Sequence, residues 1–351
     1  MASWRPVARW LDPEGRPTTA LEGIVRAAVA APSVHNTQPW WFRAYPDSID
    51  VYPDLDRQLV VVDLSGRELM LSVGAATFNL RVAILAHGWL PVRSLWPASG
   101  EDGPVARIAP AARVPVSRTV RSLAWAIPRR RTNRGPFKDI PVPATVQADL
   151  VAAAKAEGAV LRFAEPPARD ALLSLVRTAE RYWVDTPAYH EELARWSAER
   201  PGRADGIPAS AVGRRSARGA VPVRDLSVAL PEVVRLVARF EHDPAIAVLY
   251  TGDTPAEWLR AGEALQRVLL TATARGLATT LMTQPTEVPR LRALMGDRDT
   301  GRAAQAIIRF GYARLPAAPS PRRPVADVLR SRADRGVPRP GPDAVRTPHI
   351  R

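Results

Sequence analysis

Apolar and polar residues along this chain follow two different spacings, which predict a mixture of helices and strands. A capping box formed by Thr19 and Glu22 predicts the start of a helix, and apolar and small residues continue it over 21–31. Aromatic residues from Trp40 onward then predict a strand. Pro46-Asp47-Ser48 predicts the turn from this strand into a partner strand directly after it.

The second half of the chain shows the same mixture of patterns. Helices are predicted over 143–158 and over 169–196, with an interruption at Pro187. Strands are predicted over 245–250 and over 305–311, the latter as the final strand of the chain. Helices and strands therefore occur in both halves.

Two long helices, one in each half, are predicted to begin in the same way. Ser65-Gly66-Arg67-Glu68 forms the capping box of a helix that contains Gly74. Thr254-Pro255-Ala256-Glu257 forms the capping box of another, which contains Gly262 and runs to Gly276. The similar spacing of cap and inner glycine supports an internal duplication.

Neither a helical nor a strand pattern is present between Arg200 and Pro231. This segment is rich in glycine and proline and is too long for a routine connection. Such a segment can be a lid over a site or a flexible insertion, and the residues alone leave both interpretations open.

Composition limits the classes of protein to which the chain can belong. Its 351 residues, 46% of them hydrophobic, allow two halves of domain size. No run of about eighteen apolar residues and no signal-peptide core is present, so we expect a cytoplasmic protein without a membrane partner. The absence of cysteine excludes disulfides, thiolate metal sites and cysteine nucleophiles. The five histidines show no ligand spacing, and no metal site is predicted.

The net charge of +14 is compatible with binding to nucleic acid. However, Lys138 and Lys155 are the only lysines, and this bias toward arginine is typical of a GC-rich genome. Part of the excess charge lies in an arginine-rich tail over 331–351, which is predicted to be disordered. No zinc-finger spacing or aromatic RNA-binding motif is present, so no nucleic-acid partner is predicted.

Three arginines surround one hydroxyl in Arg130-Arg131-Thr132-Asn133-Arg134. A guanidinium matches phosphate oxygens with two parallel donors, and such charge-assisted bonds contribute about 1.5–3 kcal/mol each. If the segment is extended, Arg130, Thr132 and Arg134 point in the same direction. The segment therefore suits a phosphate ester, although a solvated loop is an equally open reading of these residues alone.

A second motif, Ala31-Pro32-Ser33-Val34-His35-Asn36-Thr37-Gln38-Pro39-Trp40, joins the first predicted helix to the first predicted strand. Pro32 ends the helix, and the polar side chains of Ser33, Asn36 and Gln38 supply donors and acceptors in a turn. Taken alone, the stretch can also be an ordinary helix-to-strand connection.

Together, these two stretches resemble the signatures of FMN-dependent nitroreductases. The turn over 31–40 is similar to their Ala-Pro-Ser-x-x-Asn-x-Gln-Pro-Trp signature, and the arginine stretch over 130–134 is similar to Arg-Arg-Ser-x-Arg. In an ordinary member the arginine signature comes first, whereas here it comes second. A tandem fusion that keeps one motif in each half gives this order. With Ser320-Pro321-Arg322-Arg323-Pro324, residues 15 to 330 resemble the actinobacterial Acg family of nitroreductase-like proteins.

The resemblance implies an α+β protein with a duplicated nitroreductase fold, each half a mainly antiparallel sheet flanked by helices. The implied units are an N-terminal nitroreductase-like half at 1–120 and a C-terminal half at 121–330, with a lid at about 200–231, before the disordered tail. Classical nitroreductases are dimers with flavin at the subunit interface. In a fused chain the flavin site can form without a second copy, so no oligomer is required.

The resemblance also implies which residues bind FMN. Arg130 matches the phosphate-binding arginine, and Thr132 stands where the family usually has serine. Arg134 matches the basic residue near N1 and C2=O of the flavin, where a positive charge stabilises the reduced form. An extra residue precedes Phe137 relative to the usual spacing, so the resemblance assigns no role to that ring. The full implied set is Arg130, Thr132, Arg134, Ser33, Asn36, Thr283, Gln284, Arg322 and Arg323.

The other implied residues come from three further segments. Ser33 and Asn36 match the turn that one half contributes across the interface. Arg322 or its neighbour Arg323 matches a basic residue that completes the phosphate site. Thr283 and Gln284 belong to the segment that passes the reactive edge of the flavin in nitroreductases.

The resemblance therefore implies a flavoprotein oxidoreductase that passes electrons from NAD(P)H through FMN to a small-molecule acceptor. The expected acceptor is a nitroaromatic or a quinone. No catalytic side chain is assigned, because the flavin performs the chemistry and NAD(P)H is a transient donor. The alternative is an FMN storage or sequestration protein with a lid that blocks turnover. Both hypotheses share the FMN site, so its motifs cannot decide whether the protein is an enzyme.

Overall fold

The computed structural model describes residues 10–97, 103–197, 203–217, 221–227 and 234–330. The tail predicted to be disordered, 331–351, lies outside the described residues. The α-helices are α1 (Thr19–Val29), α2 (Arg67–Ala86), α3 (Arg118–Ala126), α4 (Ala144–Lys155), α5 (Pro166–Val184), α6 (Pro187–Ser197), α7 (Pro255–Ala274), α8 (Pro289–Ala293) and α9 (Val325–Val328). The strands are β1 (Trp40–Ala44), β2 (Ile49–Pro53), β3 (Trp89–Leu95), β4 (Ala106–Arg113), β5 (Val160–Phe163), β6 (Arg215–Ser216), β7 (Val237–Ala238), β8 (Ala245–Thr251), β9 (Ala278–Leu281), β10 (Ala303–Gly311) and β11 (Leu329–Arg330).

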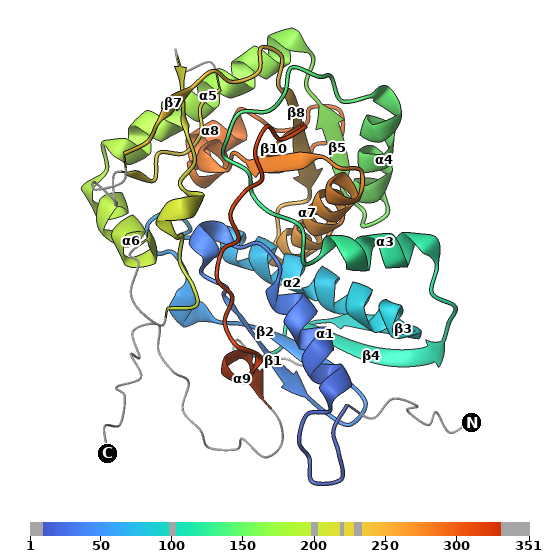
Figure 1. Cartoon of the computed structure of the whole chain (residues 1–351). Helices are drawn as coiled ribbons and strands as arrows, with labels where there is room; N and C mark the ends of the chain where they lie inside the picture. Colours follow the sequence, from blue (N-terminus) through green and yellow to red (C-terminus); the bar gives the residue numbers. More distant parts are fainter. Residues whose placement is uncertain (1–9, 98–102, 198–202, 218–220, 228–233, 331–351) are drawn as a thin grey trace.

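The first structural unit is built on a five-stranded sheet with the order β11-β1-β2-β4-β3. Neighbouring strands are antiparallel except β1 and β11, which pair in parallel with Phe42 opposite Leu329. Buried residues of this sheet and of α1 and α2 form one hydrophobic core, which includes Trp40 and Phe42. The C-terminal strand thus completes the sheet of the N-terminal unit (Figure 1).

The second structural unit is built on an antiparallel four-stranded sheet with the order β5-β8-β10-β9. Helices α4 and α7 share one hydrophobic core with this sheet, whereas α5 contributes Leu173 and Val176 to a separate core against β8 and β10. Two mainly antiparallel sheets flanked by helices confirm the predicted α+β class. The proposed duplication and the boundary near residue 120 stay predictions.

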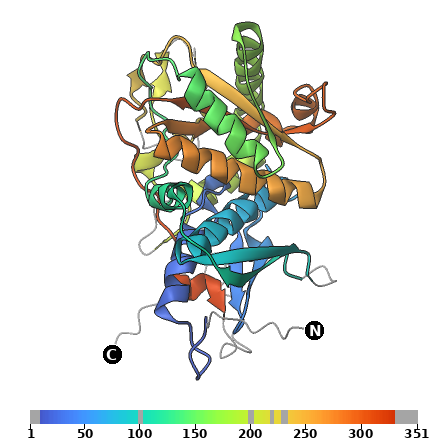
Figure 2. The same ribbon diagram turned by 90° about the vertical axis from the view of Figure 1, so that its right-hand side faces the viewer.

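Helices α2 and α7 pack against each other between the two sheets (Figures 1 and 2). They meet at two glycines: a Cβ added to Gly74 would lie 3.0 Å from the Cα of Gly262. The missing side chains therefore allow close approach of the two backbones. By length and composition α2 could span a membrane, but 83% of its most apolar window is buried inside the protein, as in a core helix.

The helix starts agree only in part with the predicted capping boxes. Thr254 caps α7 as predicted, because its side chain accepts a hydrogen bond from the backbone N–H of Glu257. The prediction for α1 was wrong by one residue: Thr18, not Thr19, accepts from the N–H of Leu21. Adjacent threonines give the same sequence signal, and only backbone geometry selects between them.

The cap predicted at Ser65 was also wrong. The carboxylate of Asp63 accepts hydrogen bonds from the N–H groups of Glu68 and Leu69 at the start of α2. A carboxylate at this end also suits the positive end of the helix dipole. Similarly, β10 is not the final strand, since β11 follows it; two residues are too short to produce a strand pattern.

Candidate active site

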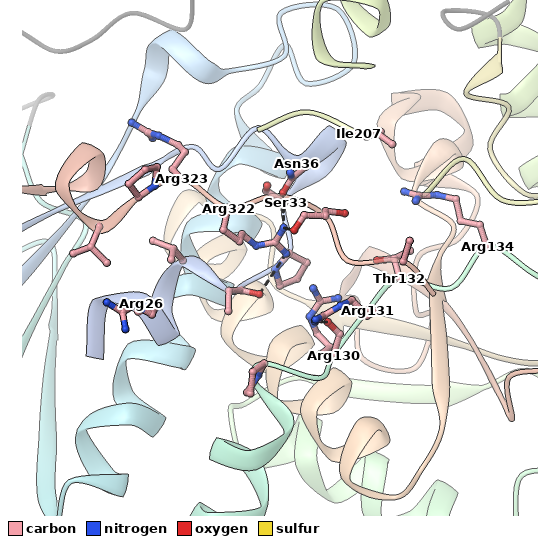
Figure 3. A pocket seen from close by; sticks show the side chains of 18 residues that line it. Arg26, Ser33, Asn36, Arg130, Arg131, Thr132, Arg134, Ile207, Arg322 and Arg323 are labelled. Carbon is pink, nitrogen blue, oxygen red and sulfur yellow. Dashed lines mark hydrogen bonds between the residues drawn. The ribbon is translucent and has the colours of Figure 1, made fainter. Parts of the chain in front are cut away.

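A cavity of about 460 Å³ lies at the junction of the two units, and we call it the arginine cavity. It receives side chains from α1, from the turn after it, from the stretch after α3 and from the C-terminal segment (Figure 3). The described residues that line it include no aspartate or glutamate. Its arginines are Arg26, Arg130, Arg131, Arg134, Arg322 and Arg323.

The arginine stretch is fixed at both ends by backbone hydrogen bonds. The N–H of Arg130 donates to the carbonyl of Ala126 at the end of α3, at 2.9 Å. The N–H of Asn133 donates to the carbonyl of Thr279 in β9, at 2.8 Å. Arg130, Thr132 and Arg134 all line the cavity as predicted for an extended segment. Arg131 lines it as well, so the alternation is not strict.

Arg130 is the most deeply placed cation of this cavity. Its side chain is 3% exposed, and its Nε and Nη1 have no hydrogen-bond partner in the described structure. Arg322 likewise has a buried Nε for which the described residues provide no partner. Unpaired buried donors cost about 1–3 kcal/mol each, and more when charged. These donors therefore fit an anionic oxygen-rich group such as a phosphate.

Electrostatics lead to the same conclusion. Burial, and then repulsion from Arg322 and Arg131, lower the pKa of Arg130 to about 9. Burial and repulsion from Arg131 lower the pKa of Arg322 to about 10. A lowered pKa of a cation means that its charged form is disfavoured in this environment. An anion bound between these guanidiniums would reverse that effect.

The turn motif forms a 3-10 helix, η1 (Val34–Asn36), directly after α1. The Oγ of Ser33 accepts a hydrogen bond from the N–H of Gln38, and both residues help to close the turn. Asn36 donates to the carbonyls of Gly206 and Pro321. Ser33 and Asn36 line the arginine cavity, and Asn36 also joins it to the segment around 206.

The two candidate C-terminal arginines differ in their surroundings. Arg322 extends toward Arg130 and Arg131, and its Nη1 donates to Oδ1 of Asn36 at 2.9 Å (Figure 3). Arg323 points away from them and donates to the backbone carbonyls of Gln38 and Trp40. Both line the cavity, but the hydrogen bonds of Arg323 hold the C-terminal segment onto the turn.

A smaller cavity of about 70 Å³, the inner cavity, adjoins the arginine cavity and shares Ser33, Thr132 and Arg134 with it. Apolar side chains from both long helices and from β9 and β10 form much of its wall: Leu71, Ala75, Leu265, Leu281 and Ala306. Its polar wall contains His35, Glu68, Ser72, Arg224 and Thr283. Its volume of about 70 Å³ admits only the edge of a planar ring that enters from the arginine cavity, and an apolar wall with few polar groups suits such an edge.

Thr283 and Gln284 are placed differently from each other. Thr283 lines the inner cavity, accepts a hydrogen bond from Arg224 at 3.1 Å and donates to Glu287 at 2.8 Å. Gln284 is buried, and its amide donates to Glu180 at 2.8 Å. Its side chain is not among those that line either cavity, so a contact with cofactor stays a prediction.

The segment predicted as a lid reaches into the inner cavity. Its residues 200–202, 218–220 and 228–233 lie outside the described residues. The guanidinium of Arg224 is buried, forms an ion pair with Glu287 and donates to the hydroxyl of Tyr189 at 3.3 Å. Glu180 accepts from the N–H of Asp225. The described part of the segment is therefore attached to the second unit by buried polar contacts.

Sequence reasoning missed several residues of the two cavities. Arg26 and Arg131 line the arginine cavity, and His35, Glu68 and Arg224 line the inner cavity. His35 lies within the turn motif over 31–40, and Arg131 lies within the arginine stretch over 130–134. Their positions inside these motifs could have identified them from the sequence. Arg224 and Glu68 carry no local signal, because only the tertiary fold brings them to the cavity.

Among known proteins, two relatives from Mycobacterium tuberculosis strain H37Rv match this chain over most of its length. The chain is 35% identical over 314 residues to "Putative NAD(P)H nitroreductase Rv3131", a match that covers 87% of this chain and 90% of the relative. It is 33% identical over 328 residues to "Putative NAD(P)H nitroreductase acg", covering 90% and 97%. A scan against protein-family models finds no match.

Among solved structures, the FMN-dependent nitroreductase NfnB from Mycobacterium smegmatis in complex with NADPH is 20% identical, with a TM-score of 0.37. That match covers 59% of this chain and 98% of NfnB. The matches to the two M. tuberculosis relatives cover 87% and 90% of this chain. The chain belongs to the Acg family of nitroreductase-like proteins.

Proposed function

We propose that this protein is an FMN-dependent oxidoreductase that uses NAD(P)H as a transient donor. The observation that carries the proposal is the buried guanidinium of Arg130: among the described residues, two of its nitrogens have no partner and no carboxylate lines its cavity. The names of the relatives include NAD(P)H nitroreductase, which supports this reaction class. A nitroaromatic or a quinone is the proposed acceptor.

FMN would supply the chemistry, transfer of a hydride from NAD(P)H and then reduction of the acceptor, and the protein would supply binding and orientation. In the arginine cavity, Arg130 and Arg322 would hold the phosphate. Thr132 would donate its hydroxyl to a phosphate or ribityl oxygen. Ser33 and Arg134 border both cavities. Ser33 would contact the part of FMN that joins phosphate to ring, and the guanidinium of Arg134 would lie near N1 and C2=O of the ring, where its charge would stabilise the reduced form.

The proposed site uses both units of one chain. Ser33 and Asn36 come from the first unit, and Arg130 and Arg134 come from the second, so no second copy is needed. The arginine stretch over 130–134 and the turn motif over 31–40 each occur once in the sequence. We therefore propose one FMN per chain. From the composition of the sequence we also propose a cytoplasmic location and no membrane or nucleic-acid partner.

The proposal is tested by loading purified protein with FMN and removing the excess. A flavin absorbance spectrum and one FMN released per chain on denaturation are expected. Arg118→Ala is the matched control for Arg130→Ala, because Arg118 is exposed on α3 and does not line either cavity. A colourless protein that does not retain FMN would refute the proposal, and two FMN per chain would refute the single site.

FMN sequestration is the second candidate function, favoured by the buried attachment of the lid. Arg224 fills part of the wall of the inner cavity and is held by Glu287. Gly206 exchanges hydrogen bonds with Asn36, which closes the lid over the turn. Lid opening can limit turnover. A turnover near that of a typical enzyme, about 10 per second, with a bulky nitroaromatic would exclude sequestration.

A further inference from the structure

His35 occupies an unusual position in the wall of the inner cavity. Its side chain is only 5% exposed, yet neither Nδ1 nor Nε2 has a hydrogen-bond partner in the described structure. Arg134 and Arg224 line the same cavity as the imidazole, whose ring centroid is 6.3 Å from that of Tyr189. It is therefore a buried polar group that no group of the described residues satisfies.

The backbone at His35 is held in a costly conformation. Its φ is +49°, and Asn36 and Gln38 in the same turn have φ values of +56° and +50°. Left-handed φ values are uncommon outside glycine, and strained residues of this kind concentrate at functional sites. Hydrogen bonds from the N–H groups of Asn36 and Gln38 to Ser33 maintain the turn. This conformation places the imidazole on the cavity wall.

A purely structural histidine would satisfy at least one ring nitrogen inside the protein. His87 at the end of α2 does so, since its Nδ1 lies 2.9 Å from the carbonyl of Ala83. Leaving a buried donor or acceptor unpaired destabilises a fold, and buried polar groups are almost always hydrogen-bonded. The missing partner of His35 is thus expected to belong to a ligand.

We infer that His35 hydrogen-bonds to the ring system of the bound flavin and thereby positions the edge of the ring at the inner cavity. The inference rests on the proposed function, because a phosphate in the arginine cavity directs the rest of FMN toward the shared residues Thr132 and Arg134. The isoalloxazine edge carries carbonyl acceptors and an N–H donor, and a neutral imidazole offers one donor and one acceptor.

The charge state of His35 agrees with this role. Burial, and then repulsion from Arg224 and Arg134, hold the pKa of His35 well below its ordinary value. The imidazole is therefore neutral near pH 7. It can orient the flavin without adding a third positive charge beside the two arginines, which leaves electrostatic stabilisation of the reduced flavin to Arg134.

The test compares two substitutions that share the same backbone cost. His35→Gln keeps a donor and an acceptor, whereas His35→Phe keeps a ring and removes both; neither new residue is β-branched, so the penalty at positive φ is similar. His87→Gln is the matched control, since His87 lines neither cavity. For each variant, FMN affinity is measured by quenching of flavin fluorescence, and the FMN-free protein is melted.

We expect His35→Phe to raise the FMN dissociation constant about tenfold, which corresponds to about 1.4 kcal/mol. His35→Gln should stay within about threefold of the wild type, and His87→Gln should match it. The FMN-free His35→Phe protein should melt no lower than His35→Gln, because it buries no unpaired nitrogen. The visible absorption band of bound FMN should shift in His35→Phe only.

Equal FMN affinity of His35→Phe and wild type would overturn the inference. An affinity loss in both His35 variants that follows a lower melting temperature would also overturn it, as it would indicate a structural role. If His35→Phe does not fold, His35→Leu replaces it with the same expectations. Failure of the wild type itself to bind FMN would instead refute the proposed function.

Discussion

Replacing Gly74 by alanine should force apart the two helices at the centre of the protein. The new Cβ would lie 3.0 Å from the Cα of Gly262 and inside the contact distance of the Leu259 carbonyl oxygen. Non-bonded carbon atoms ordinarily approach to about 3.5–4.0 Å. The contact with Gly262 alone would require helices α2 and α7 to separate by about 0.5–1 Å. The Leu259 oxygen would lie closer still to the new Cβ, so the full separation would exceed that value.

The loss of unfolding free energy caused by this separation can be estimated from substitutions that overpack a protein core. Overpacking of a core destabilises by about 1–3 kcal/mol when side chains can rotate away. Here the atoms that meet the Cβ belong to backbone, so rotamer changes give no relief. We expect the free energy of unfolding to fall by about 3 kcal/mol or more. FMN affinity should fall too, because these helices fix the spacing between Ser33 and Arg130.

Urea denaturation followed by circular dichroism, together with FMN titration, measures both effects. Gly23→Ala is the matched control: Gly23 lies in α1, and an added Cβ there has no atom within 4 Å. Both substitutions gain the same intrinsic helix propensity, so Gly23→Ala should stabilise by about 0.4–1 kcal/mol. A Gly74→Ala protein within about 0.5 kcal/mol of wild type would show that the contact is not tight, and the reasoning would fail.

Four further substitutions test the two cavities. Arg130→Ala should weaken FMN binding about 10- to 150-fold, the loss of a charge-assisted phosphate contact, while Arg118→Ala should not. Arg134→Ala should mainly lower the midpoint potential of bound FMN, because the reduced form loses its counter-charge; an unchanged potential would contradict this role. Arg224→Ala should loosen the lid and raise steady-state reduction of bulky nitroaromatics, and equal rates would exclude gating by this ion pair. Burial raises the pKa of Glu68 to about 7 from its ordinary 4.5, so the folded protein retains a proton that the unfolded chain releases. Stability due to this group should fall as pH rises from 4.5 to 7, and the difference in unfolding free energy between Glu68→Gln and wild type should change only in that window.

Contiguous motifs made most of the candidate site predictable from the sequence. Phosphate recognition needs several donors close together, and a short segment such as Arg130 to Arg134 provides them without long-range information. The turn after α1 is equally local, because a proline, a hydroxyl and an amide define it. For this reason Ser33, Thr132 and Arg134 could be placed at a cavity before the fold was known.

Other features depend on packing and left no signal in the sequence. Arg224 is one arginine among many in an irregular segment, and only its buried pairing with Glu287 distinguishes it. Strand β4 contains Arg107 and Pro110, so its alternation of buried and half-buried positions is hidden by residue types that are rare in strands. The two residues of β11 form a strand because they pair with β1, and their own sequence contains no strand pattern.

The pairing of β11 with β1 has a consequence for biosynthesis. At about 5–20 residues per second, a ribosome makes Arg322 about 15–60 s after Ser33. Throughout that interval the nascent first sheet lacks its last strand, and its β1 edge can pair with other chains. Newly made protein would acquire its complete phosphate-binding set only at the end of translation, so capture of FMN should be a post-translational event.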